Sequence, residues 1–373
     1  MGGRDVKILY GVQATGNGHI TRARAMAERL ARAGVEVDWL FSGRAPSGFF
    51  DMEPFGDYRV VPGLSFAATG GRIDRLATLR RLRPGRLVRD LWRLDLDPYD
   101  AVVTDFEPVT AWAARRARRQ AIGIGHQYAF LHRVPRAGMG PGQKLLLRHF
   151  APVTTAVGLH WHHFGQPILP PIAPVPAGEA PARREVVVYL PFERPEDIRR
   201  LLLPHRAWRF AIYHPEAPAG REGHLHWHRP SRSAFAADLA RAEGVVCNAG
   251  FELASEVLQL GRKLLVKPLA GQGEQISNAL ALELLGYGYT MRELDASALA
   301  RWLQEAQATR VSYPDVAEAL CHWLAAGAAE PVAELAARLW RAAELPDLTA
   351  LTRTDGRLPG PGGMAAGWAA PEG

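Results

Sequence analysis

Short apolar runs alternate with amphipathic segments along the first third of the chain. The runs have the length of buried strands and cover residues 6–10, 35–41, 101–104 and 121–125. The segments with helical spacing cover residues 21–33, which end at Gly34, and 109–119. Strands that alternate with helices predict a parallel sheet with right-handed crossovers.

A proline-rich stretch over 166–184 interrupts this alternation. Proline at this density excludes helix and inner strand and stiffens an extended linker. A second series of strand-like runs follows, at 185–190, 209–213, 224–228, 244–247 and 263–267. From residue 354 the chain is Gly, Pro and Ala without periodicity, which predicts a disordered tail over 354–373.

The pattern therefore predicts an α/β protein with two Rossmann-like, doubly wound parallel-sheet domains that face a central cleft. We expect an N-terminal domain over 1–165, a linker over 166–184 and a C-terminal domain over 185–350. A length of 373 residues suits two cores of this kind better than one.

Composition changes this picture little. The chain has 45 Lys and Arg against 38 Asp and Glu, a formal net charge of +7, but only four of the 45 are lysines. Such arginine enrichment can reflect codon usage, and no recognition motif accompanies it, so nucleic acid is not an expected partner. Cys247 and Cys321 are too few for a disulfide framework. Without a signal-peptide core or an apolar run of ~20 residues, we expect a cytoplasmic protein.

A glycine-rich loop follows the first strand and leads directly into a helix. Gly16, Asn17 and Gly18 allow backbone N–H groups to approach an anion at a helix N-terminus. The P-loop is excluded because Asn17 and Gly18 replace its lysine and hydroxyl residue. The dinucleotide fingerprint is excluded because Thr21 occupies the place of its third glycine.

His19 follows this loop at the carboxyl end of a strand, where open α/β sheets bind ligands. Its imidazole suits a general base. Asp105 closes another strand of the same sheet and could hold that imidazole in one tautomer. The alternatives are that His19 caps the helix or fills the turn, and that Asp105 is the N-cap of the helix after Pro108.

A second pair of glycine turns occurs between 244 and 279. Two helix N-termini there, after Gly250 and at Gly273, predict a site for a diphosphate. Glu256 lies about two turns into its helix, where a carboxylate can accept both ribose hydroxyls. Glu274 and Gln275 can bind sugar hydroxyls. Taken singly, each acid could also be a solvent-facing helix charge.

The stretch Asn248–Ala279 resembles the donor-binding segment of GT-B glycosyltransferases, which include plant-type UDP-glucosyltransferases and the bacterial N-acetylglucosaminyltransferase that makes lipid II. The stretch from Gly16 to His19 resembles their Gly-x-Gly-His loop. Over most of residues 5–290 the chain also resembles a poorly characterised family of bacterial and archaeal glycosyltransferases. The resemblance implies that His19 is the base and Asp105 its partner. It implies donor-binding residues Gly16, Asn17, Gly18, Asn248, Ala249, Gly250, Phe251, Glu256, Gly273, Glu274, Gln275 and Asn278.

Three departures from these families matter. Asn248, Ala249 and Gly250 stand where many UDP-sugar enzymes carry His-Cys-Gly, so a histidine contact to the diphosphate is missing. The neutral amide of Asn248 can donate a hydrogen bond but stabilises an anion less than a charged group does. The proline that often follows Gly-His is absent, and so is a clear aromatic-Ala-Pro-Gln platform for uracil. UDP is therefore only an assumed nucleotide.

Two histidine clusters stand apart from these motifs, at 160–163 and 224–228. Alternate side chains on one strand lie ~6–7 Å apart, too far to share one zinc ion. We expect solvated or packed histidines, no metal site, and no cofactor besides the nucleotide sugar as co-substrate.

The segment Arg72–Arg93 interleaves eight arginines with apolar residues and predicts basic amphipathic helices broken at Pro84-Gly85. One interpretation is a solvated face in an arginine-rich protein. The other is docking to anionic lipid headgroups or to an anionic acceptor, which would place the protein at the inner face of a membrane.

The resulting hypothesis is a metal-independent, inverting transfer of a sugar from a nucleotide diphosphate sugar to a hydroxyl acceptor, with a lipid-linked acceptor as one option. Two alternatives stay open. A sugar-nucleotide epimerase shares the architecture and needs no acceptor. A non-catalytic nucleotide-sugar-binding protein would leave the donor intact.

Overall fold

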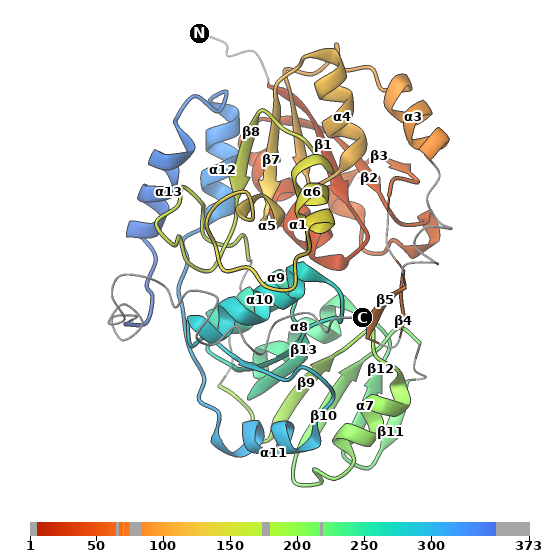
Figure 1. Cartoon of the computed structure of the whole chain (residues 1–373), viewed down its shortest axis with the longest axis vertical. Coiled ribbons are helices and arrows are strands. Elements are labelled where there is room, and N and C mark those ends of the chain that lie inside the picture. Colours follow the sequence, from red (N-terminus) through yellow and green to blue (C-terminus); the bar gives the residue numbers. More distant parts are fainter. Residues whose placement is uncertain are drawn as a thin grey trace.

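Two parallel sheets, each covered by helices, form two domains stacked along the long axis of the molecule (Figure 1). The computed structural model describes residues 6–64, 67–69, 71–74, 84–173, 180–216 and 219–347. The tail expected over 354–373 and part of the linker lie outside these residues. Among the described residues, no helix is long and apolar enough to cross a membrane.

The N-terminal sheet has the strand order β3-β2-β1-β6-β7-β8 and is parallel throughout. Its strands are β1 (Lys7–Gln13), β2 (Glu36–Ser42), β3 (Tyr58–Val61), β6 (Ala101–Asp105), β7 (Ala121–Gly125) and β8 (Thr155–Gly158). Its helices are α1 (Asn17–Arg32), α3 (Pro84–Arg93), α4 (Pro108–Ala117), α5 (His126–Ala129) and α6 (Pro141–His149), with short 3-10 turns η1 (Pro46–Gly48) and η2 (Glu53–Phe55).

The C-terminal sheet has the order β11-β12-β10-β9-β13-β14-β15, and only the edge strand β11 is antiparallel among its pairs. Its strands are β9 (Glu185–Tyr189), β10 (Arg209–Tyr213), β11 (Gly220–Glu222), β12 (Leu225–His228), β13 (Gly244–Asn248), β14 (Lys263–Lys267) and β15 (Tyr289–Thr290). The helices that follow in this half are α7 (Pro195–Leu202), α8 (Arg232–Arg241), α9 (Phe251–Gln259), α10 (Gly273–Leu284) and α11 (Ala296–Glu305).

Both sheets reverse their strand order at one point, between β1 and β6 in the first and between β9 and β13 in the second. Ligands of open α/β sheets bind outside the carboxyl ends of the strands at such points. The two carboxyl edges meet across the space between the domains, where α1 lies against α9 (Figure 1). This architecture confirms the two-domain GT-B fold that the sequence predicts.

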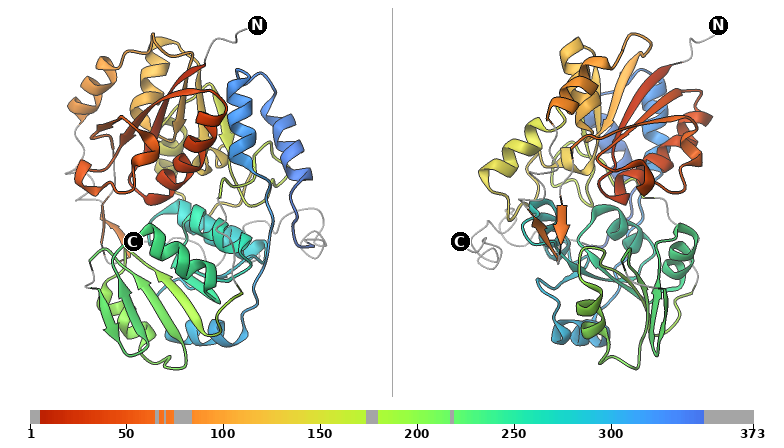
Figure 2. Two further views of the ribbon diagram at one scale, coloured as in Figure 1. Left: turned by 180° about the vertical axis from the view of Figure 1, so that it is seen from behind. Right: turned by 90° about the vertical axis from the view of Figure 1, so that its right-hand side faces the viewer.

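The last two helices depart from the expected domain boundary. We expected the C-terminal domain to continue to residue 350, but α12 (Val316–Ala325) and α13 (Val332–Arg341) lie beside the N-terminal domain (Figures 1 and 2). Helix α12 packs on α1, and Arg29 of α1 forms an ion pair with Asp315 at the start of α12, at 2.6 Å. Helix α12 follows the C-terminal domain in the sequence, yet it packs against the N-terminal domain.

The segment Arg72–Arg93 differs from its predicted helices at its beginning. A short hairpin of β4 (Ala67–Thr69) and β5 (Arg72–Asp74) precedes α3, and residues 75–83 lie outside the described part of the chain. The hairpin turn reaches the C-terminal domain (Figure 1): the Gly71 amide donates to the Phe192 carbonyl at 2.6 Å, and the Ala270 amide donates to the Gly71 carbonyl at 2.9 Å. The hairpin thus links the two domains beside the cleft.

The first glycine loop is shorter than predicted. Strand β1 continues to Gln13, so Gly11 belongs to the strand, and α1 already begins at Asn17. Gly11 is needed there because a Cβ atom would lie 2.1 Å from the Thr110 hydroxyl of α4. Gly18 and His19 consequently belong to the first turn of α1, still at the carboxyl edge of the sheet.

Candidate active site

His19 and Asp105 meet at the carboxyl edge of the N-terminal sheet. The His19 Nδ1 atom lies 2.8 Å from Asp105 Oδ1. Neither alternative role is adopted: α1 has no side-chain cap, and the cap of α4 is Glu107, whose carboxylate accepts from the Val109 and Thr110 amides. If Nδ1 donates its proton to the carboxylate, Nε2 of His19 is left to accept a proton.

Arg22 holds the other side of the Asp105 carboxylate. Its Nε donates to Asp105 Oδ2 at 2.8 Å and its Nη2 to Oδ1 at 2.7 Å, and both side chains are almost fully buried. Burial by itself would raise the pKa of Asp105, but the charge of Arg22 and the bond to His19 hold that pKa below its ordinary value. Asp105 is therefore ionised and fixed in place.

A carboxylate from the other domain completes this group. Glu252, in the first turn of α9, forms an ion pair with Arg22 Nη1. The contact depends on Gly18, because a Cβ atom there would lie 2.3 Å from Glu252 Oε2. A series of contacts thus joins the two domains: His19 to Asp105, Asp105 to Arg22, and Arg22 to Glu252 at the N-terminus of α9.

Gln127 of α5 lies between His19 and Glu274, the predicted sugar-binding acid. Its Nε2 lies 3.2 Å from both carboxylate oxygens of Glu274 and 3.5 Å from Nε2 of His19. Glu274 is in the first turn of α10. Gln127 therefore bridges Glu274 and Nε2 of His19.

Two of the predicted glycines face open space at the two helix N-termini. A Cβ atom on Gly16, the N-cap of α1, or on Gly250, the N-cap of α9, would meet no atom within 4 Å. Gly273 differs, because a Cβ there would lie 2.6 Å from Met139, in the segment leading to α6. Asn17 faces the cleft, where its amide lies 3.4 Å from the Tyr189 hydroxyl at the end of β9.

Glu256 is a carboxyl group whose partial burial raises its pKa. It is half-buried on α9 and makes no side-chain hydrogen bond within the described part of the chain. Burial raises its pKa to about 8, which Arg232 at the start of α8 only partly opposes. A neutral or ionised carboxyl here can bond to a pair of hydroxyls.

Phe251 and Asn278 lie in the core, unlike the donor contacts that the resemblance implies. Phe251 is 2% exposed and stacks on the His126 ring with centroids 3.9 Å apart. Asn278 donates to the Ala249 carbonyl at 3.0 Å, and its Oδ1 lies 2.7 Å from His126 Nε2. These residues join the donor-side loop to the N-terminal domain, and Ala249, also fully buried, presents its carbonyl to that network rather than to the cleft.

Asn248 and Gln275 shape loops. The Asn248 amide nitrogen donates to the Lys267 carbonyl at 2.9 Å, while its buried Oδ1 has no partner among the described groups. The group that Asn248 leaves free in this structure is therefore an acceptor, whereas we expect a donor-binding residue at this position to donate a hydrogen bond. Gln275 accepts a bond from the Leu269 amide at 2.8 Å, which holds the turn before α10.

Sequence reasoning missed Arg22, Gln127 and Glu252. Arg22 follows His19 by three residues, so both side chains lie on one face of a helix, and this spacing could have indicated their contact. No comparable spacing exists for Gln127 or Glu252, which reach the site from other elements and, for Glu252, from the other domain.

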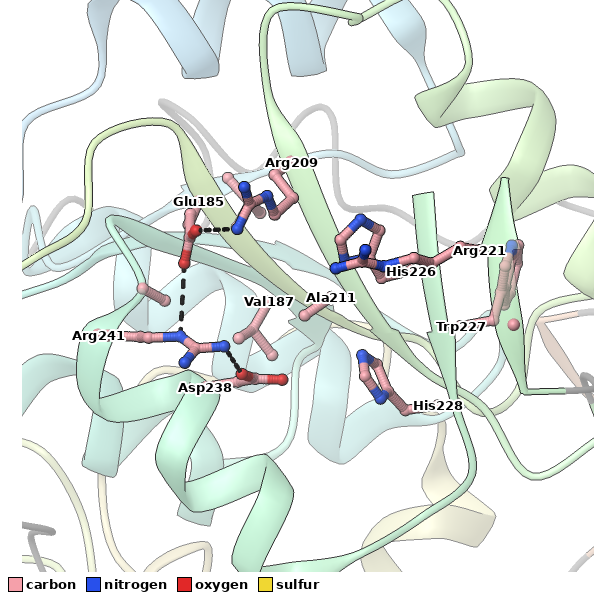
Figure 3. Close-up of a pocket in the computed structure, with 13 residues that line it drawn as sticks. Glu185, Val187, Arg209, Ala211, Arg221, His226, Trp227, His228, Asp238 and Arg241 are labelled. Atoms are coloured by element: carbon pink, nitrogen blue, oxygen red, sulfur yellow. Dashed lines mark hydrogen bonds and ion pairs between the residues drawn. The ribbon is translucent and has the colours of Figure 1, made fainter. Parts of the chain in front are cut away.

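A separate cavity of about 560 Å³ lies on the C-terminal sheet and shares no residue with this site (Figure 3). Its acids are already paired: Glu185 with Arg209 at 2.7 Å, and Asp238 with Arg241. Its lining includes histidines of the 224–228 cluster. Among the described residues, no group of three His, Cys, Asp or Glu side chains could hold a metal ion.

The comparisons with solved structures agree with this architecture. SnogD from Streptomyces nogalater, a glycosyltransferase, is 17% identical over 91% of this chain and 100% of its own, with a TM-score of 0.52. The glycosyltransferase SsfS6 from Streptomyces sp. SF2575, complexed with thymidine diphosphate, is 13% identical over 90% and 99%, with a TM-score of 0.55. UGT89C1 of Arabidopsis thaliana, complexed with UDP, is 14% identical over 90% and 100%, with a TM-score of 0.55.

The fold and the two facing sheet edges define a GT-B architecture. The model of the family called glycosyl transferase family 1 matches residues 6–139 and 164–306, so the chain belongs to that family. No curated protein matches the chain.

Proposed function

We propose that this glycosyltransferase moves a sugar from a nucleotide diphosphate sugar to a hydroxyl acceptor with inversion, and that His19 is the base. One observation carries the proposal: Gln127 lies within bonding reach of both His19 Nε2 and the Glu274 carboxylate. The atom that would take the acceptor proton and the acid that would bind the donor sugar therefore face one small volume.

In the proposed reaction, the acceptor hydroxyl gives its proton to His19 Nε2 as its oxygen bonds to the anomeric carbon. The bond from that carbon to the diphosphate oxygen breaks, and its electron pair leaves with the diphosphate. Asp105 stabilises the imidazolium. The N-terminus of α9 at Gly250 and the backbone around Gly16 stabilise the departing anion, a role that the proposal gives to the protein rather than to a metal ion.

The donor would lie along the carboxyl edge of the C-terminal sheet. Glu256 would bind the ribose hydroxyls, and Glu274 the sugar hydroxyls. Bound thymidine diphosphate in SsfS6 and bound UDP in UGT89C1 support a pyrimidine nucleoside diphosphate in this fold. UDP is the first nucleotide to test.

The acceptor would enter from the N-terminal domain, and the proposal includes a lipid-linked acceptor at the inner face of a membrane. The part of Arg72–Arg93 that forms α3 exposes two large apolar side chains, Val88 and Trp92. Arg116 of α4 lies over the Trp92 ring, 4.7 Å from its centroid. An exposed aromatic ring next to cations suits anionic headgroups.

A thermal-shift screen against UDP-, GDP-, dTDP- and CDP-sugars tests the donor site. A ligand at 100 times its dissociation constant stabilises the folded state by ~2.7 kcal/mol, which raises the melting temperature measurably. We expect one nucleotide class to stabilise the protein and Glu256→Ala to abolish the effect. The absence of any shift contradicts the donor site. Conversion of the bound donor to an isomer without acceptor identifies an epimerase, and a donor left intact with every acceptor identifies a binding protein.

A further inference from the structure

Arg22 is an unusual residue for the place it occupies. It lies one turn after His19 on α1, is 1% exposed, and uses three of its nitrogens on two carboxylates. Burial of a guanidinium is costly unless every charge is matched and every donor is used. Asp105 and Glu252 meet that requirement together, and they belong to different domains.

The contact between Arg22 and Glu252 changes the net charge beside the His19 ring. Without Glu252, Arg22 neutralises Asp105, and the pair presents no net charge to the His19 ring. With Glu252 in place the three side chains carry one net negative charge next to that ring. Negative charge within a few ångströms favours the imidazolium that forms when His19 takes a proton. Domain closure would thus supply a charge that assists the base.

The fit of this contact is specific. A Cβ atom on Gly18 would overlap the Glu252 carboxylate in its present position, so glycine at 18 leaves room for it against α1. The same first turn of α9 carries Gly250, where the diphosphate is proposed to bind. A donor that orders this turn would therefore also order Glu252.

We propose that Arg22 and Glu252 are positioning residues that complete the His19–Asp105 base through a contact between the two domains. This inference rests on the proposed function. It predicts that the proton-transfer step, rather than donor affinity, depends on Glu252. Neither residue need touch the substrate.

Glu252→Gln tests this, because Gln keeps the shape of the side chain and removes its charge. We expect kcat to fall by about 10- to 100-fold while the dissociation constant of the donor changes less than about twofold. Glu252→Asp should restore part of kcat. Glu28→Gln, at an exposed acid of α1, the helix that carries His19 and Arg22, is the matched control and should leave kcat unchanged. A loss of donor affinity that accounts for the whole defect, or an unchanged kcat, overturns the proposal.

A double-mutant cycle shows whether Glu252 acts through the base. In a His19→Gln background, Glu252→Gln should have no further effect on kcat, and full additivity overturns the proposal. If the wild-type protein turns over no donor, the proposed function fails. The contact between Arg22 and Glu252 is then tested by the melting temperatures of Arg22→Lys, Glu252→Gln and the double variant. Additive shifts in that cycle overturn the link between Arg22 and Glu252.

Discussion

The carboxyl edges of the two sheets face each other, and we call them the N-terminal and the C-terminal wall. Each wall has a carboxyl group whose pKa is shifted, but the two shifts have opposite signs. On the N-terminal wall, Asp105 accepts bonds from His19 and Arg22, and its pKa is lowered. On the C-terminal wall, Glu256 has no such partner among the described residues, and burial raises its pKa to about 8. Burial acts in the same direction on both groups, so the partners decide the sign of the shift.

This difference indicates which wall is preassembled. His19, Asp105 and Arg22 already form hydrogen bonds with one another in the structure without substrate. These bonds fix the geometry of the proposed base at the moment of reaction. The C-terminal wall instead has Glu256, which has no side-chain partner among the described residues, and the open N-terminus of α9 at Gly250, and a ligand can supply hydrogen bonds to both. We therefore expect substitutions of His19 and Asp105 to reduce turnover, and substitutions of Glu256 to reduce binding.

The largest expected effect is that of His19→Ala. Removal of a general base should lower kcat by ~10²–10⁴-fold, while donor binding at the other wall stays intact. Steady-state kinetics together with donor titration by calorimetry measure the two quantities separately. A loss of less than about tenfold would demote His19 to a structural role.

Asp105→Asn should reduce both turnover and stability. The amide cannot neutralise Arg22, and leaving a buried charge without its full partner costs ~3–5 kcal/mol of unfolding free energy. The kcat should also fall by ~10²-fold or more, because an amide does not stabilise the imidazolium. Guanidinium denaturation measures the loss of unfolding free energy. A cost of less than about 1 kcal/mol would show that Arg22 finds sufficient compensation in Glu252.

Phe251→Ala separates a structural role from a donor contact. Because the ring is buried against His126, its loss should lower the unfolding free energy by ~3–5 kcal/mol, as for other large core residues. Phe251→Leu should cost less. If donor affinity falls in these variants while stability does not, Phe251 contacts the donor after all.

Glu256→Gln should change how stability depends on pH. The folded-state pKa of about 8 exceeds the ordinary value of 4.5, so the folded state keeps a proton that the unfolded state releases. The wild type should therefore lose stability, relative to the variant, as the pH rises from about 5 to about 8. Urea denaturation of both proteins across this range measures the difference, and parallel curves would show that Glu256 is not buried in solution.

The chemistry of the dyad followed from local patterns. A histidine after a glycine turn and an aspartate at a strand end must both lie at the carboxyl edge of one parallel sheet, and the structure places them 2.8 Å apart. The resemblance was less reliable within the donor segment. It implied donor contacts for Phe251 and Asn278, which the structure buries in the core.

Boundaries were predicted less well, for identifiable reasons. Gly11 looked like a loop residue, although it lies in β1 because Thr110 of α4 leaves no room for a side chain. The helices α12 and α13 continue the C-terminal half in sequence, but they lie beside the N-terminal domain, where α12 packs on α1 (Figure 1). An amphipathic helix shows that it has a buried face and not which domain that face covers.

The sequence by itself determined the alternation of strands and helices, the two glycine turns and the residues that follow them, because these depend on spacing along the chain. Only the tertiary structure decided that Gln127 connects His19 with Glu274, and that Glu252 reaches Arg22. Those contacts join residues more than 100 positions apart. They depend on how two separate sheets face each other, a relation that no local pattern of side chains records.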